Sequence, residues 1–214
     1  MKKIFIASLS LNPNLQTAKV NPIGFELNTR MTDSYNPIVP IMESFVEEGD
    51  IVKLLVIRQK TTNEADKNNM AHLENELSSV GLLEKVRIEE IILEEWQSKE
   101  VLLTLFEELI NRFENDALYY ADVTFGVKPY PIILNTAFRY VDKVLKNTDI
   151  RGIYYQEIVR NENGKPIDAR LFDVSVLSTL FNMIDFIGEV APDNASRLIG
   201  NLLHPEGGED NAIK

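Results

Sequence analysis

Short apolar runs alternate with amphipathic stretches along most of this chain. Five segments have the length of buried strands and are rich in branched or aromatic residues: residues 4–7, 51–57, 86–93, 117–123 and 150–159. Between them, apolar residues recur every three or four positions, which is typical of helices that bury one face. The pattern predicts a helix from Asn36 that ends at Gly49, and helices around the stripes that begin at Met70, Leu102, Ile133 and Leu177.

Strands that alternate with helices predict an α/β fold, Rossmann-like, with a mainly parallel sheet and helices on both faces. Residues 17–32 are too many for an ordinary connection and contain the strand-like patches AKV and IGFEL, which predicts a hairpin inserted after strand 1. Asn-Glu-Asn-Gly at residues 161–164 separates two strand-like segments and predicts a late antiparallel hairpin. We therefore expect one Rossmann-like domain over residues 1–190, followed by a linker or C-terminal tail over residues 191–214.

Composition and charge narrow the classes of protein. The 214 residues include no cysteine, which excludes a disulfide scaffold, a thiol enzyme and an iron–sulfur carrier. With 22 basic and 33 acidic residues the net charge is −11, and no basic stripe is present to neutralise the phosphates of a long nucleic acid. The apolar runs are far shorter than the about 20 residues of a membrane-spanning helix. We expect a cytoplasmic protein that contacts neither long nucleic acid nor membrane.

We look for ligand-binding residues where strands end, because open parallel sheets bind ligands beyond the carboxyl ends of their strands. The first strand leads into Ser8-Leu9-Ser10, and the fourth leads into DVTFGVKPYP at residues 122–131. There Thr124 offers a hydroxyl, Gly126 lets the backbone approach a ligand, and Lys128 supplies a cation. The prolines at 129 and 131 suit a first helical turn, so we expect free N–H groups and the positive helix end to face the ligand.

Two interpretations of these loops stay open. The fourth-strand loop is either an anion site or a strand-to-helix turn that binds nothing, and the two serines either contact a ligand or only satisfy backbone groups at the strand end. Gln156 and Glu157, near the end of the fifth strand, could also reach the site.

Other kinds of chemistry find no support in the sequence. Neither G-x-G-x-x-G nor G-x-x-x-x-G-K-[ST] occurs, so we expect no dinucleotide cofactor and no P-loop. His72 and His204 have no carboxylate or second histidine at metal-ligand spacing, so we expect no metal site and no catalytic triad.

The pattern Asp122-x-Thr124-x-Gly126-x-Lys128-x-x-Pro131 resembles the CARF family, the CRISPR-associated Rossmann-fold domains. One branch of that family carries Asp-x-Thr-His-Gly-x-Arg-x-x-Pro after its fourth strand. Here a lysine replaces the arginine, and a phenylalanine at position 125 stands where the branch has a polar residue. The resemblance extends to the opening MKKIFIASLS and to the late hairpin, and it covers most of residues 1–190.

The resemblance implies a homodimeric sensor domain of a type III CRISPR ancillary protein in antiviral defence. Such domains bind cyclic oligoadenylate, as tetra- or hexa-adenylate, across the two-fold axis and activate an effector, which would lie outside this chain. The implied ligand-binding residues are Ser8, Leu9, Ser10, Thr124, Phe125, Gly126, Val127 and Lys128.

Two alternatives remain beside the sensor. One is a stand-alone ring nuclease that cleaves the ring without metal, by attack of a ribose 2′-hydroxyl on its own phosphate, with Lys128 and Ser10 as candidate catalytic residues. The other is a non-catalytic α/β protein that binds a partner.

Overall fold

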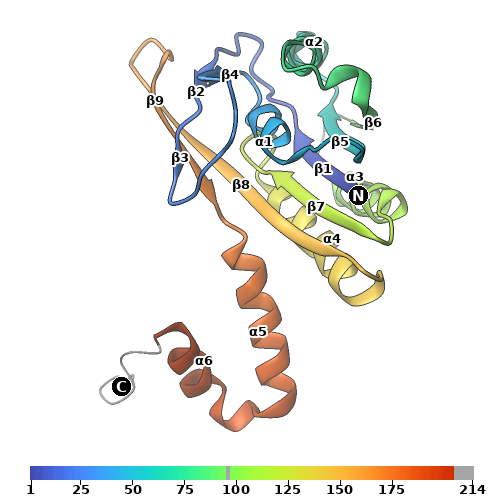
Figure 1. Ribbon diagram of the computed structural model, residues 1–214, viewed down its shortest axis with the longest axis vertical. Coiled ribbons are helices and arrows are strands. Elements are labelled where there is room, and N and C mark those ends of the chain that lie inside the picture. The colour runs from blue at the N-terminus through green and yellow to red at the C-terminus, as the bar shows by residue number, and fades with distance from the viewer. Residues whose placement is uncertain (95–96, 205–214) are drawn as a thin grey trace. The chain divides into compact units, whose positions relative to one another are not determined.

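The computed structural model describes residues 1–94 and 97–204, which form alternating strands and helices (Figure 1). The chain divides into two compact units, of which the first is Met1–Val174 and the second begins at Ser175. The first unit holds the sheet and the candidate site.

A seven-stranded sheet in the order β3-β9-β8-β7-β1-β5-β6 organises the first unit (Figure 1). Five adjacent strands, from β8 to the edge strand β6, run parallel: β1 (Lys2–Ser8), β5 (Ile51–Gln59), β6 (Val86–Leu93), β7 (Ala117–Asp122) and β8 (Asp149–Arg160). The next strand, β9 (Pro166–Asp173), pairs antiparallel with β8 through the turn at Gly164. This confirms the predicted Rossmann-like α/β fold and its late antiparallel hairpin.

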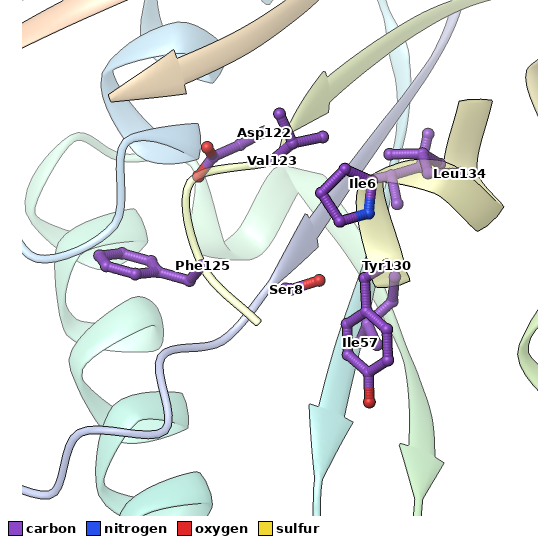
Figure 2. A pocket seen from close by; sticks show the side chains of 9 residues that line it. Ile6, Ser8, Ile57, Asp122, Val123, Phe125, Tyr130 and Leu134 are labelled. Atoms are coloured by element: carbon purple, nitrogen blue, oxygen red, sulfur yellow. The ribbon is translucent and has the colours of Figure 1, made fainter. Parts of the chain in front are cut away.

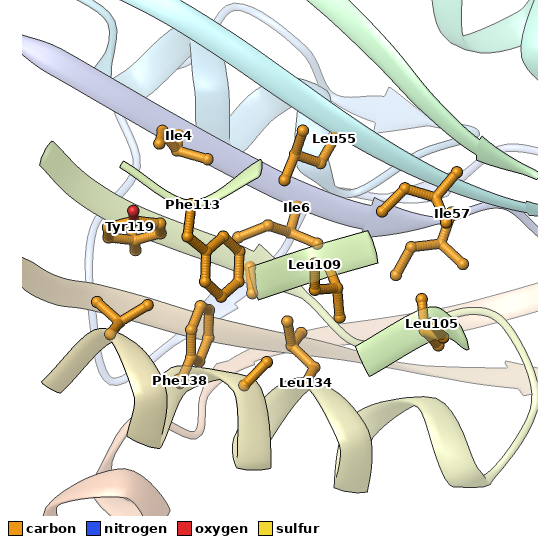
Figure 3. Close-up of a cluster of buried hydrophobic side chains, with 14 of the residues drawn as sticks. Ile4, Ile6, Leu55, Ile57, Leu105, Leu109, Phe113, Tyr119, Leu134 and Phe138 are labelled. Carbon is orange, nitrogen blue, oxygen red and sulfur yellow. The ribbon is translucent and has the colours of Figure 1, made fainter. Parts of the chain in front are cut away.

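Helices cover both faces of the sheet, because its strands are apolar on both sides. On one face α3 (Lys99–Arg112) and α4 (Pro129–Val144) enclose a core that includes Ile6, Tyr119 and Phe138 (Figure 3). On the other face α1 (Ile38–Phe45) and α2 (Ala65–Ser79) enclose a second core, and the 3-10 turn η1 (Leu83–Lys85) leads into β6. The helix expected from Asn36 is thus shorter than predicted, while Gly49 does lie in a left-handed turn after it, with φ +84°.

The insertion after β1 contains an antiparallel strand pair, but with a different partner from the one expected. β2 (Ala18–Lys19), within the AKV patch, pairs with β4 (Asp33–Ser34) and not with the IGFEL patch. β3 (Pro22–Ile23) instead extends the main sheet by pairing parallel with β9. The reason is packing: Phe25 and Leu27 join the α1/α2 core, and the Phe25 ring centroid lies 5.5 Å from that of Tyr154.

The second unit consists of helices. α5 (Val176–Val190) is followed by the 3-10 turn η2 (Pro192–Asn194) and by α6 (Ala195–Leu203). The stripe that begins at Leu177 forms a helix. The domain end at residue 190 stays a prediction, and the division into compact units falls after residue 174. The predicted linker or tail contains α6, and residues 205–214 lie outside the described part. Within the described residues no helix is long and apolar enough to cross a membrane.

Candidate functional site

The candidate site lies where the chain leaves the sheet in opposite directions. From β1 the chain passes to β5 on one side, whereas from β7, the neighbour of β1 on its other side, it passes through α4 to β8. The carboxyl ends of β1 and β7 therefore form the topological switch point, where open α/β sheets bind ligands. Ser8 ends β1, Asp122 ends β7, and the turn at residues 123–128 follows (Figure 2).

The turn packs directly on the end of β1. Gly126 has φ +96°, and a Cβ added there would lie 2.9 Å from the Cβ of Ser8 and 2.8 Å from Cδ2 of Tyr130. Such distances leave no room for a side chain, so glycine is required by both conformation and space. The structure thus brings Ser8 and the fourth-strand loop together, as the sequence suggested.

The hollow beneath the turn is too narrow to hold a ligand. Its lining includes Ile57 and Leu134 together with Phe125, and its interior has no space for a water molecule (Figure 2). A ligand of nucleotide size therefore has to lie on the outer, solvent-facing side of the turn.

The turn itself offers hydrogen-bond donors. Within the described residues, the backbone N–H groups of four consecutive residues meet no protein acceptor: Phe125, Gly126, Val127 and Lys128. Successive N–H groups in a turn that contains a left-handed residue form a concave site for anions. We call residues 124–128 the N–H turn.

Of the four donors only the N–H of Lys128, the N-cap of α4, belongs to the helix start, and this corrects the sequence prediction. α4 begins at Pro129, and neither Pro129 nor Pro131 has an N–H group. The N–H of Tyr130 donates to the carbonyl of Val127 at 2.9 Å. The sequence itself carried this signal, because two prolines in a first turn remove two of the donors expected there.

Lys128 and Thr124 play different parts in the turn. Lys128 precedes α4, is exposed, and forms no ion pair within the described part of the chain. Thr124, in contrast, is engaged inside the protein: its hydroxyl accepts the N–H of Gln156 at 2.8 Å and hydrogen-bonds to Asp122. Lys128 is therefore available to a ligand, while Thr124 holds the turn on β8.

Gln156 links the turn to the insertion. Its side chain is buried and donates from Nε2 to the carbonyl of Lys19 at 2.8 Å. Its neighbour Glu157 points to Arg170, at 3.9 Å, within the late hairpin. Of the two residues considered from the sequence, only Gln156 reaches the N–H turn.

Leu9 and Ser10 follow β1 and are both buried. Leu9 is buried, and its N–H donates to the carbonyl of Ile57 at 3.0 Å. Ser10 is 5% exposed; its Oγ accepts the N–H of Asn12 at 3.1 Å, and its carbonyl accepts Nδ2 of Asn69 at 2.7 Å. Leu9 and Ser10 are therefore buried residues, and these hydrogen bonds are all within the protein.

Asp122, which the sequence indicated only as part of a motif, is buried at the end of β7. Its carboxylate is 2% exposed and accepts the N–H of Thr124 at 2.9 Å, while the N–H of Ile38 and the Thr124 hydroxyl also donate to it. Burial raises its pKa from 3.8 to about 6, because water no longer stabilises the charged form. An aspartate two residues before a threonine at a strand end is typical of such a local turn.

No group of three or more His, Asp or Glu side chains in the described part of the chain is placed to hold a metal ion. No protein-family model matches this chain, and a search of the curated proteins also finds no match. The site combines a donor-rich turn with Lys128, which forms no ion pair among the described residues, at the switch point of a Rossmann-like sheet.

Proposed function

We propose that this chain binds cyclic oligoadenylate at the N–H turn, as the sensor domain of a type III CRISPR ancillary protein related to the CARF family. The observation that carries this proposal is the row of four unpartnered backbone N–H groups beside Lys128. Phosphodiester oxygens only accept hydrogen bonds, and each bears part of a negative charge, so they match a site that only donates.

The size and charge of the site favour a compact ligand. A long nucleic acid needs many Lys or Arg contacts to phosphates, whereas this chain has a net charge of −11 and one unpaired lysine at the turn. A homodimer would bring two N–H turns to one small ring, and a ring of identical nucleotides can satisfy a two-fold axis. A homodimer with one ring is therefore the assembly that we propose.

The geometry favours binding over cleavage. Of the two candidate catalytic residues, Ser10 is buried with its Oγ already in a hydrogen bond, and Lys128 is exposed. A lysine beside backbone donors can hold a phosphate, but in-line attack by a ribose hydroxyl also needs a group that accepts its proton. We therefore rank sensing above ring cleavage, and partner binding without a ligand below both.

Calorimetric titration with cyclic tetra- and hexa-adenylate tests this proposal, with linear tetra-adenylate for comparison. We expect one ring per two chains, tighter binding of one ring than of the linear form, and a rise in the melting temperature. The change Lys128→Gln should weaken binding about tenfold or more, since each dimer loses two charge-assisted contacts. Lys143→Gln, an exposed change in the last turn of α4, is the matched control and should bind normally.

Two results would overturn the proposal: no binding of either ring at about millimolar concentration, or equal binding by the Lys128 and Lys143 variants. Chromatography of the ring after incubation distinguishes sensing from cleavage, because a ring nuclease releases linear products.

A further inference from the structure

A buried carboxylate without a basic partner lies directly behind the N–H turn. Asp122 is 2% exposed, and no ion pair to it occurs within the described part of the chain. Its hydrogen bonds join the two loops at the switch point, because Thr124 belongs to the turn and Ile38 to the start of α1. Asp122 is therefore one of the residues that hold the donor site in shape.

Few charges surround Asp122. Tyr154 of β8 pairs with Asp122 in the sheet, and Tyr130 of α4 lines the same hollow. Burial raises the pKa of Tyr130 to about 12, so this side chain is neutral. Burial raises the pKa of Tyr154 as well. The end of β1 and the first turn of α1 carry no charged side chain, and Lys128 is the cation of the turn itself.

We propose that Asp122 is a proton-linked positioning residue: an anion held by the N–H turn binds together with one proton, which the Asp122 carboxyl takes up. This inference rests on the proposed anion site and adds its regulation. Once protonated, the carboxyl donates to Oγ of Thr124, and the Thr124 hydroxyl hydrogen, which now points to Asp122, is released toward the ligand. The N–H of Thr124 still finds an acceptor in the other carboxyl oxygen.

The physical reason is repulsion between two anions in a poorly solvated place. For two unit charges about 8 Å apart at an effective dielectric constant of about 20, the interaction corresponds to about a 30-fold change in affinity. Since the pKa of Asp122 is about 6, the carboxyl is mostly ionised at neutral pH, and a bound anion raises that pKa further. Affinity should therefore increase as the pH falls toward 6.

Without any ligand, protonation of Asp122 also stabilises the folded chain, so the free energy of unfolding rises as the pH falls. The folded-state pKa of about 6 lies above the ordinary value of 3.8, so the folded chain holds this proton more tightly than the unfolded chain. The stabilisation is fully present below the unfolded pKa and is lost as the pH rises through about 6. Asparagine at this position imitates the protonated acid, since it both accepts and donates.

The test is calorimetric titration of cyclic tetra-adenylate and, separately, of sulfate between about pH 5.5 and about pH 8, where neither probe changes charge. The background carries His72→Gln and His204→Gln, so that the chain contains no imidazole. We expect the affinity of the otherwise unchanged chain to fall 10- to 30-fold, roughly, across this range, and that of Asp122→Asn to stay constant. Asp193→Asn, at an exposed aspartate, controls for the loss of one negative charge and should retain the full pH dependence.

Each outcome decides between the two proposals. If the ring binds but its affinity does not change with pH, or changes equally in Asp122→Asn, the proton linkage is wrong while the proposed function stands. If sulfate binds with the expected dependence and the ring does not, the linkage stands and the proposed function fails. If neither probe binds, both are overturned.

A second measurement covers the case in which Asp122→Asn does not fold. Titration of the unchanged chain in two buffers with different ionisation enthalpies reports the protons taken up on binding. We expect a value that rises toward one per site near neutral pH, and a value of zero would overturn the inference.

Discussion

Gly126 is the residue on which the geometry of the N–H turn depends most directly. Its φ of +96° lies in the left-handed region, and an added Cβ would approach Tyr130 and Ser8 to within 2.9 Å. We expect Gly126→Ala to lower the free energy of unfolding by about 2–4 kcal/mol, because backbone strain and overpacking add. Urea unfolding followed by circular dichroism measures this loss.

Gly164→Ala separates the two contributions. Gly164 also has a positive φ, +75°, but no atom lies within 4 Å of its added Cβ, so the change introduces strain alone. We expect a loss of about 1 kcal/mol. Equal losses in the two variants would show that the contact between the turn and β1 contributes nothing.

At this scale the sequence predicted residue types better than their roles. Gly126 and Lys128 could be recognised because conformational freedom and charge are properties of the residue itself. The engagement of Thr124 with Gln156 and Asp122 could not, because it depends on how β7 and β8 align. The same holds for the burial of Ser10, which follows from the position of Asn69 on α2.

At the scale of elements, a buried carboxylate of α2 holds the segment that leads into α1. Glu76 of α2 is buried and accepts four hydrogen bonds from the segment that leads into α1. Its Oε1 accepts the Ser34 hydroxyl at 2.9 Å and the Tyr35 N–H at 2.6 Å. Its Oε2 accepts the N–H of Asn36 at 3.1 Å and the Nδ2 of the same residue at 3.0 Å. This connection ends at the α1 start, which also donates to Asp122. The insertion and the N–H turn therefore share one support.

The change Glu76→Ala tests that support. It removes the acceptor of the Tyr35 N–H and of the Asn36 side-chain amide, while the Asn36 N–H keeps the Ser34 hydroxyl oxygen at 3.0 Å, so we expect a loss of about 2–3 kcal/mol in the free energy of unfolding. The amide protons of Tyr35 and Asn36 should exchange much faster with solvent, which hydrogen exchange by NMR measures. Glu74→Ala, an exposed change on the same helix, should cost less than about 0.5 kcal/mol. A Glu76 variant as stable as the Glu74 variant would contradict the role given to these bonds.

Elements with a regular period were predictable, and irregular ones were not. The parallel strands and the helices from Met70 to Val144 follow from apolar spacing, which is local information. The pairing of β2 with β4 is decided by where Phe25 and Leu27 find a core, and no local pattern records that. The helix α6 was missed because it is short and follows two breaks, Pro192 and Asn194.

At the scale of the whole molecule, sheet order and net charge act in opposite directions on a ligand. The order of the strands brings the end of β1 beside that of β7, so the N–H turn packs on Ser8 although the two are far apart in the sequence. The order itself follows from general rules for parallel sheets, which is why the location of the candidate site was predictable from the sequence. Net charge, −11 per chain, surrounds that point with a repulsive field for any anion.

This opposition predicts an unusual salt dependence for binding of the proposed ring. Approach is governed by the long-range field, which repels the ring, whereas the attraction of Lys128 and the N–H turn acts at contact. Raising the ionic strength from about 0.01 to about 0.1 M shortens the screening length from about 30 to about 10 Å. The association rate constant should therefore rise several-fold with salt, while the complex dissociates faster because the contact attraction is also screened. Stopped-flow mixing with a fluorescent ring measures both rates, and Lys128→Gln should shorten the lifetime without reversing the trend in association. An association rate that falls with added salt would mean that the local potential of the turn, and not the net charge, controls the approach of the ring.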